Sequence, residues 1–161
     1  MDSVKKFRAF YIEHKDKFFA YLMRMTGDYH LAGDIMQESF TRYLERYGAD
    51  NQSAALLYTI GRNVFFDNRR RQKRNTPLQE DQPDCAQDQE YDLWVREEYR
   101  QVLTALQKLD EGERDLLALV VSSGLAYREI AKMVGISEAN LKVKVHRSRT
   151  RLRQILQAGD L

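Results

Sequence analysis

Apolar side chains recur every three or four residues through almost all of this 161-residue chain, and one segment breaks the pattern. That spacing places apolar groups on one face of an α-helix. The exceptional segment, residues 75–92, contains both prolines, many Gln and Asp residues and few large apolar side chains, so it cannot bury enough apolar surface to order itself. The sequence therefore predicts an all-α protein with two small helical domains, residues 1–74 and 93–161, joined by a flexible acidic linker.

Three helices are expected in the first domain. The first ends at Gly27, which suits a C-cap, and the second begins after Asp28, whose carboxylate suits an N-cap. The second helix extends to about Tyr47 and is followed by a loop, Gly48 to Gln52. A third helix starts near Ser53 and continues into a strongly basic segment.

The second domain ends in a stretch, Tyr127 to Arg153, that has the layout of a helix-turn-helix. It combines a short helix, a turn around Gly135 and a longer helix for which Ser137 is a natural N-cap. Upstream, Asp110 and Glu113 match a capping box that opens another helix. The second helix of a helix-turn-helix enters the DNA major groove, so the sequence predicts a DNA-binding domain.

The longer helix has an apolar side and a basic side. Between residues 138 and 153 there are six Lys and Arg residues and one acid, Glu138. Lys and Arg donate to guanine, Asn pairs with adenine and an exposed Val contacts a thymine methyl group, while further cations neutralise phosphates. The alternative is an ordinary solvated helix face. The helix-turn-helix spacing instead favours DNA contacts by Asn140, Lys142, Val143, Lys144, His146, Arg147 and Arg149.

Charge is strongly segregated along the chain, although the net charge is only +2. Residues 62–74 carry six basic residues and one acid, whereas residues 75–92 carry six acids and no Lys or Arg. There is no apolar run long enough to cross a membrane and no secretion signal, and the single cysteine, Cys85, excludes an internal disulfide. We expect a soluble cytoplasmic protein with two basic surfaces that bind an anionic ligand.

Two sets of motifs lie at opposite ends of the chain. The first set is Ala32–Phe40, AGDIMQESF, with Leu56–Arg70, LLYTIGRNVFFDNRR; the second is Leu125–Met133, LAYREIAKM, with Gly135–Arg149, GISEANLKVKVHRSR. Together they resemble the bacterial sigma factors of the extracytoplasmic-function (ECF) group, over nearly the whole chain and in the family's order. The resemblance implies an alternative sigma factor that binds core RNA polymerase and directs promoter recognition and transcription initiation. It implies no catalytic residues, cofactor or metal.

The resemblance also assigns a docking surface. Asp34, Gln37, Glu38 and Phe40 match the positions through which the family docks on the clamp helices of the polymerase largest subunit. The first three of these, with Thr41, fall within about two helical turns and make a polar acidic patch suited to a basic coiled coil. Polymerase contacts are expected at the clamp helices and at the flap.

The promoter contacts implied by the resemblance divide between the two domains. The basic face of the last helix reads the −35 element, and the first domain handles the −10 strand through Asn51, Gln52, Arg62, Asn63, Arg69, Arg70 and Arg71. In the family, the loop before the third helix captures a base flipped out of the strand, and such a base also needs a stacking surface. Tyr47 and Tyr58 are the candidates for stacking, although both are expected in the core.

The chain departs from the family pattern at four positions. Leu56 replaces the usual Trp, and Gly61 replaces Ala, which predicts either a weaker helix or unusually close packing. Ala126 replaces a capping Ser or Thr that normally contributes about 1 kcal/mol. Val143 replaces Ser at a base-facing position and indicates a distinct −35 preference.

Two other functions, a DNA-binding regulator and an enzyme, fit the sequence less well. A helix-turn-helix regulator with an unrelated N-terminal sensor domain would need an α/β receiver, and residues 1–74 contain no alternating strand pattern. An enzyme would need a nucleophile and base, a metal cluster or a phosphate loop, which the sequence lacks. Because ECF sigma factors are commonly held inactive by an anti-sigma protein, we expect such a partner. Whether the linker occupies a polymerase channel or is a simple tether stays open.

Overall fold

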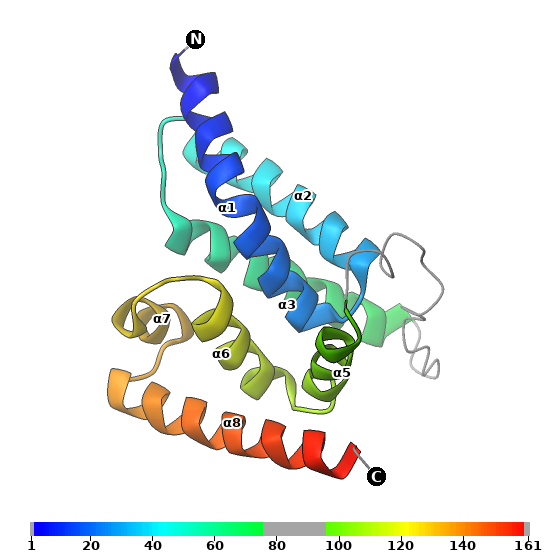
Figure 1. Ribbon diagram of the computed structural model, residues 1–161. Helices are drawn as coiled ribbons and strands as arrows, with labels where there is room; N and C mark the ends of the chain where they lie inside the picture. The colour runs from blue at the N-terminus through cyan, green and yellow to red at the C-terminus, as the bar shows by residue number, and fades with distance from the viewer. Residues whose placement is uncertain (1, 76–95, 160–161) are drawn as a thin grey trace.

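The computed structural model describes residues 2–75 and 96–159, and within these ranges the chain forms helices and no strands (Figure 1). The first half contains α1 (Asp2–Thr26), α2 (Tyr29–Tyr47) and α3 (Ala54–Asn75). The second half contains α5 (Glu97–Leu106), α6 (Glu111–Ser122), α7 (Tyr127–Val134) and α8 (Glu138–Gly159). The all-α prediction is confirmed. The predicted linker, residues 75–92, lies outside the described residues except for Asn75 at the end of α3.

The predicted helix ends in the first half are confirmed. Gly27 closes α1 with φ of 65°, in the left-handed region that favours glycine, and its N–H donates to Met23 O. The Asp28 carboxylate caps α2 by accepting from the backbone of His30 and Leu31. The Ser53 hydroxyl accepts from the Leu56 N–H at the start of α3. Local polar chemistry therefore sets where these helices begin and end.

Similar caps position the helix-turn-helix in the second half. The Asp110 carboxylate accepts from Glu113 N at 2.8 Å, and the Ser137 hydroxyl accepts from Asn140 N at 3.0 Å. The side chain of Ala126 has no oxygen with which to cap α7. The Glu129 carboxylate accepts from Ala126 N at 3.1 Å, so half of the usual capping box survives the substitution.

The two halves share one continuous hydrophobic core, with α6 between α1 and α8 (Figure 1). In the first half the core is rich in aromatic rings, and Phe18 stands edge-on to both Phe40 and Tyr58. In the second half it contains Leu117 and Leu141. Because α6 packs on both sides, it links the helix-turn-helix directly to the first three helices.

Gly61 of α3 packs directly against Phe18 of α1. A Cβ atom at this position would lie 2.5 Å from Phe18 Cζ, and Phe18 is fully buried among other rings. The sequence predicted either a weaker helix or unusually close packing at Gly61, and the close packing is confirmed.

Replacing Gly61 with alanine is expected to lower the free energy of unfolding by up to about 2 kcal/mol. Overpacking costs about 1–3 kcal/mol, and the better helix propensity of alanine offsets about 1 kcal/mol of it. Urea denaturation followed by circular dichroism measures the change. Gly33→Ala is the matched control, because a Cβ at Gly33 in α2 has no neighbour within 4 Å. Equal stability of the two variants would contradict the packing argument.

Candidate nucleic-acid and polymerase interface

The outward side of α8 carries the predicted DNA-reading residues. Leu141, Val145 and Ser148 form its buried stripe, as the spacing predicts. All seven predicted contact residues are exposed: Asn140, Lys142, Val143, Lys144, His146, Arg147 and Arg149. Val143 is 46% exposed, which leaves an apolar side chain among cations, as a reader of thymine methyl groups requires.

Helical geometry arranges these exposed residues across the outward face. At 3.6 residues per turn, Val143 and His146 lie nearest the middle of the outward face, with Arg147 and Asn140 on the side of it that turns toward α6. Lys142 and Arg149 are seven residues apart on one flank, and Lys144 lies on the other flank, toward α6. The middle of the face is suited to base edges and the flanks to phosphates.

The acidic surface of α2 is largely present as predicted. Asp34, Gln37 and Glu38 are exposed on one side of the helix, and Glu38 pairs with Arg42 at 2.7 Å within the same helix. Thr41 is also exposed on this helix. These side chains form a polar patch that is open to a partner.

Phe40 does not lie on that surface, although it matches one of the family's docking positions. Phe40 is only 6% exposed, and its ring packs edge-on against Phe7, Tyr11 and Phe18. The physical reason is the aromatic core between α1 and α2, which buries a large apolar ring at this position. Phe40 supports the acidic patch from beneath.

The loop before α3 is held by a buried tyrosine. Tyr43 donates its hydroxyl to Asn51 O at 2.6 Å and accepts from Ser53 N at 2.8 Å, while the side chains of Asn51 and Gln52 remain exposed. Of the two stacking candidates, Tyr58 is fully buried, as expected. Tyr47 is 39% exposed beside Tyr43, so its expected place in the core is wrong.

The arginines of α3 occupy different environments. Arg70 pairs with Asp67 in its own helix at 2.6 Å, and Asn63 and Arg71 are exposed. Arg62 and Arg69, in contrast, reach α6 in the second half: Arg62 Nε lies 2.7 Å from Asp115 Oδ2, and Arg69 Nε lies 3.2 Å from Glu111 Oε1. In the free protein these two predicted promoter contacts are therefore occupied by carboxylates.

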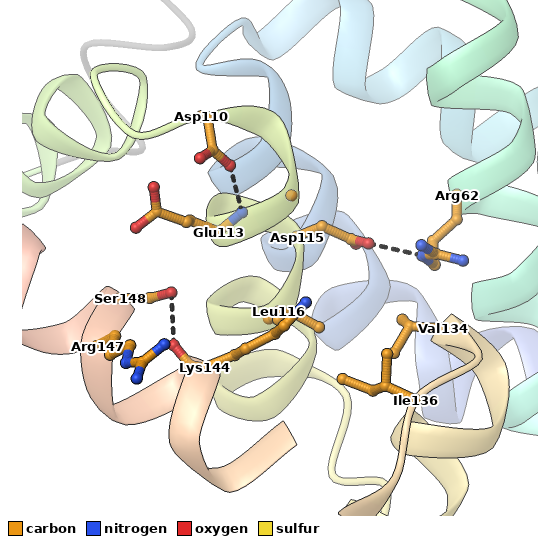
Figure 2. A pocket seen from close by; sticks show the side chains of 11 residues that line it. Arg62, Asp110, Glu113, Asp115, Leu116, Val134, Ile136, Lys144, Arg147 and Ser148 are labelled. Atoms are coloured by element: carbon orange, nitrogen blue, oxygen red, sulfur yellow. Dashed lines mark hydrogen bonds and ion pairs between the residues drawn. The ribbon is translucent and has the colours of Figure 1, made fainter. Parts of the chain in front are cut away.

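Asp115 is the buried centre of this contact. Tyr21 donates its hydroxyl to Asp115 Oδ1 at 2.6 Å. Arg62 donates to the other oxygen (Figure 2). Burial raises the pKa of the Asp115 carboxyl above its usual value, and the Arg62 charge and these hydrogen bonds offset part of the rise. Burial and the adjacent carboxylate also raise the pKa of Tyr21 well above its usual value, so its hydroxyl remains a donor.

A pocket of about 400 Å³ lies next to this contact, between α3, α6 and α8 (Figure 2). Arg62 and Asp115 form one wall, and Asp110 and Glu113 form another. Its lining also includes Lys144 and Arg147 of α8. The last helix and Arg62 of α3 thus border the same space.

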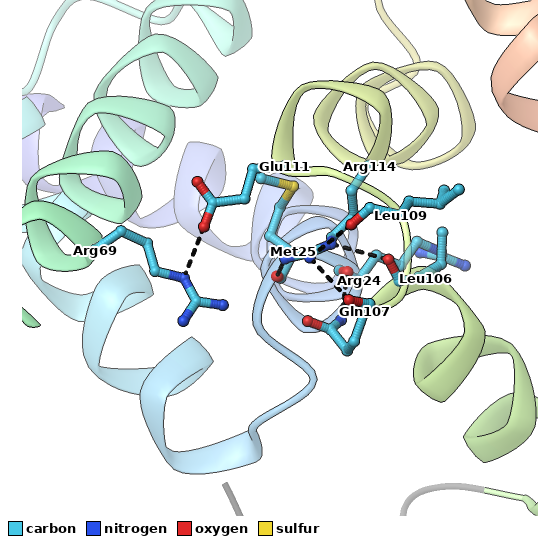
Figure 3. Close-up of polar contacts among 8 residues, drawn as sticks. All are labelled: Arg24, Met25, Arg69, Leu106, Gln107, Leu109, Glu111 and Arg114. Atoms are coloured by element: carbon cyan, nitrogen blue, oxygen red, sulfur yellow. Dashed lines mark hydrogen bonds and ion pairs between the residues drawn. The ribbon is translucent and has the colours of Figure 1, made fainter. Parts of the chain in front are cut away.

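Arg114 is a buried cation that bonds to both halves. Its guanidinium donates to four backbone carbonyls: that of Met25 in α1, across the two halves, and those of Leu106, Gln107 and Leu109 at and after the end of α5, within its own half (Figure 3). Burial lowers the pKa of this guanidinium. A single cation therefore satisfies carbonyls at the C-terminal ends of two helices, where the helix dipole also favours positive charge.

Among the residues described, no group of three His, Cys, Asp or Glu side chains could hold a metal ion. The described helices also include none that is long and apolar enough to span a membrane. The chemistry that the described side chains offer is recognition of anionic and polar partners by charge and hydrogen bonding.

Comparisons with known proteins match both halves of the chain. Residues 10–75 match the family described as sigma-70 region 2, and residues 99–152 match sigma-70 region 4. The ECF RNA polymerase sigma factor SigM of Bacillus subtilis (strain 168) is 30% identical over 149 residues, which cover 88% of this chain and 89% of SigM.

Two solved structures share the fold across both halves. One is the sigma factor RpoE in complex with the anti-sigma factor NepR from Bartonella quintana, with a TM-score of 0.79, 21% identity, and coverage of 95% of this chain and 98% of the matched chain. The other is CnrH in complex with the cytosolic domain of CnrY, with a TM-score of 0.65, 23% identity, and coverage of 94% and 89%.

Proposed function

This chain belongs to the ECF RNA polymerase sigma factors of the sigma-70 family, and from that membership we propose how its surfaces divide the work of initiation. It is an alternative sigma factor, which binds core RNA polymerase and directs it to promoters. The regulator with an unrelated sensor domain is not supported, because residues 10–75 match sigma-70 region 2 and fold into helices. In our proposal the chain acts in the cytoplasm and contributes no catalytic residue.

The domains of the proposal are those expected from the sequence. Residues 1–74 dock on core polymerase and handle the −10 element, residues 75–92 join the halves, and residues 93–161 read the −35 element and contact the flap. The observation that carries the proposal is the pairing of two open surfaces: the acidic patch of α2 and the basic outward face of α8.

We assign the −35 contacts to α8 by position. Val143 and His146 face base edges, because they lie at the middle of the outward face, and Asn140 and Arg147 reach base edges from one side of it. Lys142, Lys144 and Arg149 bind phosphates on the flanks. The exposed valine, where the family more often has serine, favours a −35 sequence with a thymine methyl group at its contact.

The docking and −10 contacts follow from the first half. Asp34, Gln37 and Glu38 face the polymerase clamp helices, and Phe40 supports them. Asn51, Gln52 and Asn63 offer hydrogen bonds to a flipped base, and the exposed ring of Tyr47 offers the stacking surface. Arg62, Arg69, Arg70 and Arg71 hold the phosphates of the melted strand.

An anti-sigma protein completes the proposed set of partners. The solved structures of RpoE and CnrH each hold a second protein, NepR or the cytosolic domain of CnrY. Because this chain shares their fold over both halves, we propose that a comparable regulator binds it.

Replacing Lys142 and Val143 together, by Ala and Ser, is expected to change the preferred −35 sequence. Each base contact is worth about 1–3 kcal/mol of discrimination, so preference should change at the position that Val143 contacts, while the loss of the Lys142 phosphate contact lowers transcription from all sequences alike. The measurement is transcription by core polymerase plus this sigma factor from a promoter library randomised in the −35 block, followed by sequencing of the transcripts.

Arg149→Ala is the matched control for that experiment. Arg149 lies on a flank and is assigned to a phosphate, so its loss should reduce transcription from all −35 sequences alike and weaken the salt dependence. A change of preferred sequence in Arg149→Ala, or none in the double variant, would overturn the assignment of the α8 faces.

A further inference from the structure

Two rows of opposite charge meet across the two halves of the free protein. Arg62 and Arg69 stand two turns apart on α3, and Asp115 and Glu111 stand about one turn apart on α6. Each arginine pairs with one acid, at 2.7 Å for Arg62 with Asp115 and at 3.2 Å for Arg69 with Glu111. The two helices therefore meet through faces of opposite charge, rather than through one isolated ion pair.

The inner pair is well shielded from water. The Asp115 side chain is 3% exposed and the Arg62 side chain 18%. Ion pairs buried in this way contribute little net stability compared with apolar packing, because both charges lose their hydration. An interface built only for stability would use apolar side chains at these positions, so the charges suggest a contact with a second, switchable role.

Tyr21 sets the geometry of that pair. Its hydroxyl donates to Asp115 Oδ1, which leaves Oδ2 directed at Arg62. Tyr21 is itself fully buried in the first half, so the carboxylate from α6 is received by a prepared site on α1 and α3. Other hydrogen bonds, from Arg24 to the Ser122 hydroxyl and from Gln107 to Arg24 O, also join the two halves.

We propose that α6 is an internal competitor for promoter DNA: Asp115 and Glu111 hold Arg62 and Arg69 in the free protein, and DNA phosphates must displace them. The inference rests on the proposed function, because it takes these arginines as strand contacts. A carboxylate and a phosphate satisfy a guanidinium in the same way, so both cannot occupy it at once. The free chain therefore binds single-stranded DNA only in the fraction of molecules whose halves have separated.

The test measures binding of fluorescent oligothymidylate to the full chain by anisotropy. This probe reports phosphate contacts without requiring a known promoter sequence. The Glu111→Gln variant is expected to bind oligothymidylate roughly five- to tenfold more tightly than wild type, because its halves separate more easily. The double variant, Glu111→Gln with Asp115→Asn, is expected to bind at least as tightly as Glu111→Gln. Circular dichroism and thermal melting check that each variant is folded; should the double variant unfold, Glu111→Gln alone decides.

Glu113→Gln is the matched control. It changes the net charge equally, but its partner, Arg151 at 3.3 Å, belongs to the same half. If Glu113→Gln tightens binding as much as Glu111→Gln, the effect is one of net charge and the internal competitor is refuted. Unchanged binding in Glu111→Gln would refute it as well.

A second pair of variants separates this inference from the proposed function. In the Glu111→Gln background, Arg62→Ala with Arg69→Ala should remove the gain in affinity. If these arginines prove irrelevant to oligothymidylate binding in every background, the −10 assignment itself fails. If they contribute to binding but neutralising Glu111 has no effect, the −10 assignment stands and only the competition by α6 fails.

Discussion

Replacing Arg114 with leucine is expected to lower the free energy of unfolding by about 3 to 5 kcal/mol, because four hydrogen bonds from a charged donor are lost at once. The guanidinium is 4% exposed and donates to four carbonyls in two helix ends. Leucine fills part of the volume but leaves those carbonyls without their donor, and each buried orphan costs about 1–3 kcal/mol. Urea denaturation of the full chain measures the loss.

Two further variants make that result specific. Arg114→Lys keeps the charge but offers a different donor geometry, so its stability should fall between those of wild type and Arg114→Leu. Arg128→Leu removes an exposed arginine from α7 and should change stability by at most about 0.5 kcal/mol. Wild-type stability in Arg114→Leu would mean that the carbonyls find water or other donors and that Arg114 does not join the helix ends.

Reversing charge in the α2 patch is expected to weaken core polymerase binding at least about tenfold. Asp34→Lys with Glu38→Lys replaces two exposed acids and places like charges against the basic clamp helices assumed in the proposal, a juxtaposition that costs several kcal/mol. A loss of only about 1.4 kcal/mol already gives a tenfold effect. Titration of labelled sigma factor with core polymerase measures the affinity.

The control for the patch is an acid elsewhere on the first half. Asp16→Lys reverses a side chain that is 90% exposed on α1, and we expect polymerase affinity close to wild type. Helicity and melting temperature should be preserved in both proteins, because the changed side chains are at the surface. If the Asp34→Lys, Glu38→Lys variant binds core polymerase as tightly as the wild type does, α2 is not part of the docking surface.

The helices and their ends could be predicted because the signals that set them are local. Asp28, Asp110 and Ser137 accept from backbone N–H groups two or three residues away, and Gly27 and Gly135 provide positive φ at helix ends. The exposed face of α8 was also predictable, because a period of 3.6 residues sorts side chains into buried and exposed rows.

What the sequence could not show is the packing of one half on the other. Residues such as Arg62 and Asp115 are 53 positions apart, and no local pattern specifies that they meet. In the sequence, Arg114 cannot be told from any other charged residue of a helix, because its partners are backbone carbonyls and no sequence pattern identifies them. Phe40 and Tyr47 were misplaced for a related reason: whether an aromatic residue on an amphipathic helix is covered depends on which neighbouring helix lies over it.

The central claim is that one chain provides two promoter-reading surfaces to core polymerase, and in vitro transcription of a genomic library tests it most directly. Core polymerase would be run with and without the wild-type chain, and the starts of the transcripts would be mapped. The account predicts new start sites that appear only with the chain and share two upstream sequence blocks at a constant spacing. It would be contradicted if the start sites were the same as those of core polymerase alone, or if the new sites shared only one block.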